Sequence, residues 1–298
     1  MVLQRKGAQT VEHREFLERI GFSREMIDRY EKLSPVEAQL TPLAQQYARG
    51  EISLEKALEE AAAAEGGYPY GRELALIVAC GKACFPALAR QHSQALTWNA
   101  LRDITAKAKE CQARYGVLGT FVPTWFDGFF RGTRIALDRL QFDIRTNEEL
   151  TVSFGSFSLQ PGDFLLGCHI PSGSPLTAQA RLQDYHRAWE LFRPRLRDGI
   201  LPVVCYSWLL YPPQLPVYGK GSNLEDFCRD YFVFTQDGAE GFPDAWRVFS
   251  MDVPAELSLL PQNTRLQRSF WDYLARGGKC GWGYGLLLYD GTEILTRW

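Results

Sequence analysis

The segment DFLLGCHIPSGSPLTAQARLQDYHRAWELF, residues 163–192, decides the fold of this chain. Residues 163–171 are mostly apolar and predict a strand, and residues 172–175 predict a tight turn. Residues 176–195 predict an amphipathic helix, whose inner face would carry Leu182, Tyr185, Ala188, Trp189 and Phe192. A second apolar strand, LPVVCYSWLL, follows at residues 201–210. A strand, a tight turn at a helix N-terminus and another strand form an arrangement that can hold a phosphate-bearing ligand.

The composition limits the classes of protein to which this chain can belong. The chain has 298 residues, is 46% hydrophobic and carries a net charge of −2, which is ordinary for a soluble protein of two domains or one large one. It has no run of Lys and Arg, so nothing favours nucleic acid, and its apolar runs are too short to cross a bilayer. The N-terminal segment lacks the apolar core of a signal peptide. The seven cysteines are scattered without a CxxC pair, so we expect a reduced, cytoplasmic protein.

The chain changes character near residue 117, after which glycine and tryptophan become more frequent. Residues 1–117 read as helices: Ser53 is a helix cap, and residues 72–91 form a nearly continuous apolar helix that Pro86 should kink or split. Residues 118–298 read as strands and helices. Residues 135–144, 149–159 and 164–170 should form an antiparallel meander, and residues 201–210 a central strand. We therefore predict an α+β protein with a helical domain at 1–117 and a mixed, mainly antiparallel sheet flanked by helices at 118–298.

Several short strings, in this order and at these spacings, resemble the bacterial two-domain N-acyltransferase family, which joins an N-acyltransferase N-terminal domain to a GNAT-like C-terminal domain. The strings are LRDI at 101–104, LQFD at 140–143, HIPSGSPL at 169–176, CYSWLL at 205–210, Ser222-Asn223, TRLQ at 264–267 and GGKCGWGYG at 277–285. The resemblance implies a GNAT-like fold with acetyl-CoA or another acyl-CoA as co-substrate. It also implies direct transfer of the acyl group to an amine on a small molecule or peptide.

The loop after residue 169 is the expected cofactor site. Backbone N–H groups there, beside a helix N-terminus, suit a diphosphate. The expected cofactor-binding residues are Ile170, Ser172, Gly173, Ser174 and Asn223. Most GNAT enzymes carry R/Q-x-x-G-x-G/A at this point, whereas residues 171–175 read PSGSP, without Arg or Gln. The alternatives are an ordinary strand-to-helix turn and a non-catalytic GNAT-fold binding module with a degenerate CoA loop.

Three residues are candidates for the chemistry. An imidazole can take a proton from an amine near neutral pH, and His169 is the histidine beside the expected loop. Ser207, on the second strand, and Tyr231, which the resemblance suggests for the departing thiolate, would interact with the thioester end. Each has a structural alternative: a buried hydrogen-bonded histidine, a serine bonded to backbone, a core aromatic. Cys205 lies in an apolar strand, which favours an inert thiol over a nucleophile, and no residues have metal-ligand spacing.

Overall fold

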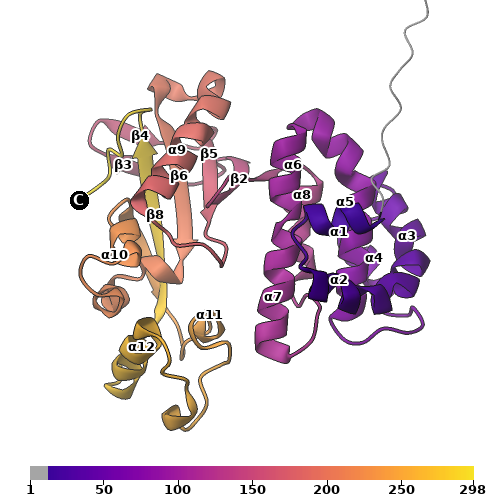
Figure 1. Cartoon of the computed structure of the whole chain (residues 1–298). Coiled ribbons are helices and arrows are strands. Elements are labelled where there is room, and N and C mark those ends of the chain that lie inside the picture. The colour runs from indigo at the N-terminus through magenta and orange to yellow at the C-terminus, as the bar shows by residue number, and fades with distance from the viewer. Residues whose placement is uncertain (1–12) are drawn as a thin grey trace, which may run out of the picture. The chain divides into compact units, whose positions relative to one another are not determined.

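The computed structural model describes residues 13–298, and the chain divides into two compact units, Met1–Ala136 and Leu137–Trp298. Figure 1 colours the first unit indigo to magenta and the second pink to yellow. Each unit has its own core. In the second unit the helices and strands bring together residues that are far apart in the sequence, and this is the unit that holds the expected site.

The first unit is helical. Its longest helix, α5, packs against α3, α4, α6, α7 and α8 and supplies much of the buried apolar core. The elements are α1 (His13–Arg19), α2 (Arg24–Tyr30), α3 (Ser34–Ala48), α4 (Leu54–Ala61), α5 (Gly71–Gln91), α6 (Gln94–Leu101), α7 (Asp103–Tyr115), α8 (Asp127–Phe130) and the short strand β1 (Arg134–Ala136). The predicted cap at Ser53 is present, because its hydroxyl accepts the backbone N–H of Lys56.

Two features of this unit differ from the sequence prediction. Helix α5 runs through Pro86 without being split, because packing on several sides outweighs the loss of one backbone hydrogen bond. The helical unit also extends past residue 117. Leu118, Phe126 and Phe130 belong to its buried core, so the structural division falls after Ala136 rather than at the predicted position.

The second unit is built on a mixed sheet in which the strands lie in the order β2-β5-β6-β8-β7. Only β5 and β6 pair in parallel; the other neighbours in this series are antiparallel. The strands are β2 (Gln141–Thr146), β5 (Phe164–His169), β6 (Leu201–Ser207), β7 (Phe232–Gly238) and β8 (Gly281–Tyr289). A mixed, mainly antiparallel sheet is what the sequence predicted.

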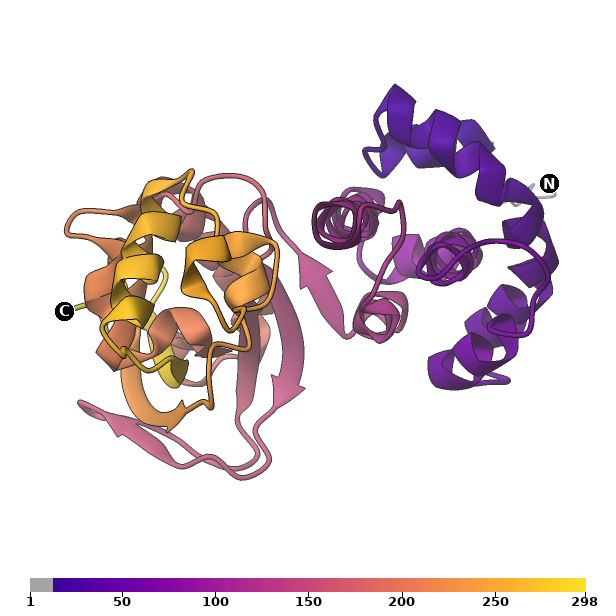
Figure 2. The same ribbon diagram turned by 90° about the horizontal axis from the view of Figure 1, so that it is seen from below.

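The predicted three-stranded meander is wrong in one respect. Strands β2 and β5 pair directly, from Gln141↔His169 to Thr146↔Phe164, while β3 (Val152–Phe154) and β4 (Phe157–Leu159) form a separate hairpin between them. Asn147 closes the base of this insertion, because its backbone bonds to Asp163 and Gly162 and its side chain bonds to Leu150. Figure 2 shows the hairpin as a separate two-stranded ribbon beside the main sheet.

The two faces of the sheet are covered by different elements. On one face, apolar side chains of the β3–β4 hairpin pack on Leu165, Val204 and Leu286. Helix α9 (Ala178–Phe192) covers the other face, where Tyr185 contacts Phe142 (Figure 1). Leu182, expected on the inner face of this helix, is exposed, and Arg181 and Asp184 are buried instead. The remaining helices are α10 (Asn223–Cys228), α11 (Ala245–Phe249) and α12 (Arg265–Ala275).

Candidate functional site

The parallel strands β5 and β6 stop pairing before either strand ends. Their register joins Leu166 to Val203 and Gly167 to Val204, whereas β5 continues to His169 and β6 to Ser207. Backbone groups of parallel strands that leave the ladder need other partners, and a ligand inserted between the strands is one source of them. We call this unpaired region between the carboxyl ends of the two strands, beside the loop at residues 170–177, the opening.

His169 stands at one side of this opening and is held by a carboxylate. Its Nε2 lies 3.0 Å from Oδ2 of Asp143 on the neighbouring strand β2. Arg145 donates to the same oxygen at 2.5 Å. The His169 side chain is 29% exposed and that of Asp143 10%. A neutral imidazole that donates its Nε2 proton to a carboxylate carries its lone pair on Nδ1, so the pair has the arrangement of an oriented base.

Across the opening, aromatic side chains form what we call the aromatic platform: Tyr206, Trp282, Tyr284 and Phe234. Tyr206 and His169 lie on the same face of the sheet, since each is two residues beyond the last register pair, Gly167↔Val204. The Tyr206 ring lies 6.1 Å from that of Trp282 and 5.9 Å from that of Tyr284. The Phe234 ring lies 4.9 Å from that of Tyr284 and is tilted by 38° from it. Tyr206 remains 54% exposed, so the platform is accessible.

The opposite face of the same opening is buried and holds thiols and phenols. Tyr231 is fully buried, and its hydroxyl lies 3.4 Å from that of Tyr185. Burial raises the pKa of Tyr231, so its phenol stays neutral. A hydrogen bond with Cys168, together with burial, raises the pKa of Cys205 well above its ordinary value. A thiol in this environment is a poor nucleophile, in agreement with the expectation that Cys205 is inert.

The loop at residues 170–177 joins β5 to α9. Gly173 has a φ of +128°, which L-residues rarely adopt, and an added side chain would meet open space. Thr177 caps α9 by accepting the N–H of Ala180 at 3.3 Å. Ser172 and Ser174 are exposed on either side of Gly173, and Ile170 is half-buried directly after β5. The structure thus brings these four predicted cofactor residues to one exposed turn at a helix N-terminus.

Ser207 and Asn223 already serve the local backbone. Strand β6 ends at Ser207, earlier than predicted, because its hydroxyl accepts the N–H of Leu209 and starts a 3₁₀ turn. Asn223 is the first residue of α10, which Ser222 caps by accepting the N–H of Glu225. Ser207 follows Tyr206 on the strand that borders the opening. Among residues 13–298, no hydrogen bond links Asn223 to the loop.

Sequence reasoning missed two residues of the site. Asp143, which orients His169, could have been noticed as a carboxylate between Phe142 and Ile144 in a half-buried strand. Arg139, whose Nη1 donates to the carbonyl of Pro171 at 2.9 Å, gave no such signal. Within residues 13–298 there is no cluster of three or more His, Cys, Asp and Glu side chains suited to a metal ion. No helix in this same range has the length and apolar character needed to span a membrane.

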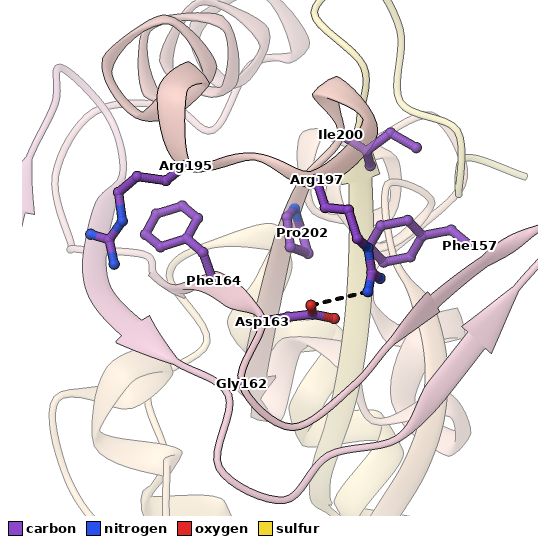
Figure 3. Close-up of a pocket in the computed structure, with 8 residues that line it drawn as sticks. All are labelled: Phe157, Gly162, Asp163, Phe164, Arg195, Arg197, Ile200 and Pro202. Carbon is purple, nitrogen blue, oxygen red and sulfur yellow. Dashed lines mark hydrogen bonds and ion pairs between the residues drawn. The ribbon is translucent and has the colours of Figure 1, made fainter.

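A separate pocket lies at the other ends of β5 and β6. Figure 3 shows its lining residues, Phe157, Gly162, Asp163, Phe164, Arg195, Arg197, Ile200 and Pro202. Arg197 bonds to Asp163 at 3.0 Å, and the guanidinium of Arg195 lies 4.2 Å from the ring centre of Phe164. Because Phe164 and Pro202 are at the start of their strands, this pocket is at the opposite end of β5 and β6 from His169 and Ser207.

Comparisons with known proteins agree with this architecture. Residues 11–132 match the N-acyltransferase N-terminal domain, and residues 135–287 match the GNAT-like C-terminal domain. No curated protein matches the chain. One similar solved structure is an acyltransferase in complex with decanoyl-CoA, at 23% identity and a TM-score of 0.68, covering 92% of this chain and 86% of that one. Another is an acyltransferase with decanoyl-CoA and teicoplanin, at 22% identity and a TM-score of 0.69, with the same coverage. The predicted fold class is confirmed.

Proposed function

From the fact that the chain belongs to the two-domain N-acyltransferase family, we propose that it moves an acyl group from acyl-CoA to an amine on a small molecule, in the opening between β5 and β6. The family makes the protein an acyltransferase with an acyl-CoA co-substrate. The single observation that supports this position for the chemistry is the hydrogen bond between His169 and Asp143 at this opening. The roles of individual residues below are part of the proposal.

The proposed reaction is a direct transfer. His169 takes a proton from the acceptor amine, whose nitrogen attacks the thioester carbonyl carbon. The carbon–sulfur bond breaks, CoA leaves as a thiolate, and the amide forms. Ser207 borders the opening and can donate to the thioester end. Tyr231 lies behind the strands with a raised pKa, so we assign it a neutral hydrogen-bonding role rather than full proton donation.

For the donor, the exposed turn at Ser172, Gly173 and Ser174 offers backbone N–H groups next to the N-terminus of α9, which favours an anion. We propose that the diphosphate of CoA binds there. Similar structures contain decanoyl-CoA, which makes medium-chain donors the first to test beside acetyl-CoA.

For the acceptor, the aromatic platform indicates the kind of molecule. Exposed aromatic rings bind apolar or ring-shaped ligand surfaces. Burial raises the pKa of Tyr206, and the carboxylate of Asp237 raises it further. The negative charge of Asp237 therefore lies beside the platform. We propose an acceptor that carries its amine on a body with apolar or ring-shaped faces. A similar structure is described with teicoplanin, which supports this class of acceptor.

The test is thiol release from acetyl-, octanoyl- and decanoyl-CoA with a panel of amines that includes a teicoplanin-type glycopeptide, with the amide product identified by mass spectrometry. Amine-dependent thiol release is expected, and His169→Gln should lower it. Tyr206→Leu should raise the KM for the acceptor up to about tenfold, since an aromatic pair contributes roughly 0.5–1.5 kcal/mol. CoA affinity should stay unchanged in that variant.

The binding-module alternative has a different signature. CoA would stabilise the protein, by about 2.7 kcal/mol at a hundred times its dissociation constant, but no donor–acceptor pair would release thiol above the background rate. That outcome would overturn the enzymatic proposal and leave CoA binding in place. An absence of CoA stabilisation would overturn both.

A further inference from the structure

The loop between β5 and α9 is held at both ends by buried arginines from other parts of the unit. Nη1 of Arg139, from the turn before β2, donates to the carbonyl of Pro171 at 2.9 Å. Nη1 of Arg181, on α9, donates to the carbonyl of Leu176 at 2.7 Å. Arg139 is 8% exposed and Arg181 1%. Buried guanidinium groups thus bind the backbone on both sides of the exposed turn at Gly173.

Among the described residues, only one of these two guanidinium groups forms ion pairs. Arg181 bonds to Asp226 and to Asp230, each at 2.8 Å. Within the described part of the chain, Arg139 forms no ion pair, and its Nε is buried without a hydrogen-bond partner. Burial lowers the pKa of Arg139, which reflects the cost of keeping a cation away from water.

Asp184, the carboxylate whose charge favours the charged form of Arg139, bonds to backbone groups instead. Asp184 of α9 is completely buried and accepts the backbone N–H groups of Asp138, Arg139 and Leu140 at 3.1, 2.6 and 2.7 Å. Those bonds fix the turn that carries Arg139 against α9. These backbone hydrogen bonds orient the Arg139 side chain toward Pro171. They do not pair Asp184 directly with the Arg139 guanidinium. A buried cation in this position is stabilised by any anion that binds on the loop.

We infer that Arg139 is the cation that the diphosphate of CoA uses in this protein, in place of the Arg or Gln that the loop lacks. The inference rests on the proposed function. Residues 171–177, PSGSPLT, contain no basic side chain, so the positive charge has to come from another element. Arg139 acts in two ways, by holding the carbonyl of Pro171 and by placing its charge behind the turn that offers backbone N–H groups.

The inference predicts which part of the donor feels Arg139. CoA and dephospho-CoA both carry the diphosphate, and they differ in the 3′-phosphate; pantetheine has neither. Arg139→Gln should therefore weaken binding of CoA and dephospho-CoA alike, by roughly 10- to 100-fold, as expected for unit charges about 6–12 Å apart at an effective dielectric constant of about 20. Pantetheine should bind with unchanged affinity.

The experiment is isothermal titration calorimetry with these three ligands, by competition where binding is weak, on the full chain. Arg139→Lys, which keeps the charge, should stay within a few-fold of the wild type. Arg187→Gln is the matched control: Arg187 bonds to Asp138 of the same turn at 2.7 Å but is exposed, so its loss should not affect any of the three ligands.

Equal losses for pantetheine and CoA would overturn the inference, because Arg139 would then only anchor the loop. A Lys variant as weak as the Gln variant would also overturn it. If Arg139→Gln does not fold, two other measurements test the inference. Arg139→Lys should keep the CoA affinity within a few-fold, and added salt should weaken CoA binding to the wild type more than pantetheine binding. If wild-type protein binds no CoA at all, it is the proposed function that fails.

Discussion

Replacing Arg181 by methionine should destabilise the protein by about 3–5 kcal/mol at pH 7, the usual cost of breaking a buried ion pair by removing one partner. Arg181 joins α9 to Asp226 and Asp230, and through Leu176 to the candidate cofactor loop. Asp230 is fully buried, so the variant leaves a carboxylate in the interior. Arg297 also bonds to Asp226 and Asp230, which keeps the expected value toward the lower end of that range.

The pH dependence has a definite sign. Burial raises the pKa of Asp230, and the ion pairs with Arg181 and Arg297 oppose that rise. Without Arg181 the pKa of Asp230 rises further. When the pKa of a carboxyl group is higher in the folded than in the unfolded protein, the free energy of unfolding falls as pH rises. The fall begins near the unfolded-state pKa, about 3.9, and ends above the folded-state pKa. The variant should therefore be closer to wild type at pH 5 than at pH 7, by at most about 1.4 kcal/mol per pH unit.

Urea denaturation followed by circular dichroism at both pH values measures these differences. Arg187→Met, on the same helix α9, is the control. The Arg187 side chain is 40% exposed, and its ion pair with Asp138 should contribute less than about 1 kcal/mol to stability. Adding Asp230→Asn to Arg181→Met should recover part of the loss. A double variant that is less stable than Arg181→Met, or a larger loss at pH 5 than at pH 7, would refute the argument from an uncompensated buried charge.

Three further changes test the site. His169→Gln should lower kcat by about 10²- to 10⁴-fold, and Asp143→Asn added to it should cost little more, because the two act as a unit; losses that multiply independently would contradict this. Gly173→Val should weaken CoA binding, whereas the control Gly199→Val should not. Both glycines have a positive φ with open space around them, so each substitution strains the backbone by about 1–3 kcal/mol. Equal CoA affinity in the two variants would show that the loop is not part of the site. Cys205→Ala should keep turnover within a few-fold of wild type with no acyl-enzyme detected by mass spectrometry, and a loss above about 100-fold would favour a covalent route.

Local sequence signals predicted the strand, turn and helix at the centre of the second unit. Apolar alternation, a hydroxyl cap and the glycine at residue 173 act over a few residues, so they are visible without the fold. The same signals predicted the helical character of the first unit, because helix periodicity is local. They left open whether Pro86 would kink or split its helix, and packing of α5 on its neighbours keeps that helix unsplit.

Tertiary structure decided the charges of the site. Asp143 comes to His169 only because β2 pairs with β5 in one register, and a shift of one residue would turn its side chain to the other face. Arg139 reaches Pro171 only because Asp184 fixes the turn before β2 against α9. Hydrogen bonds and ion pairs between distant residues depend on distances of a few ångströms that no local pattern encodes. Local patterns therefore located the turn between β5 and α9, and packing decided which charged groups lie next to it.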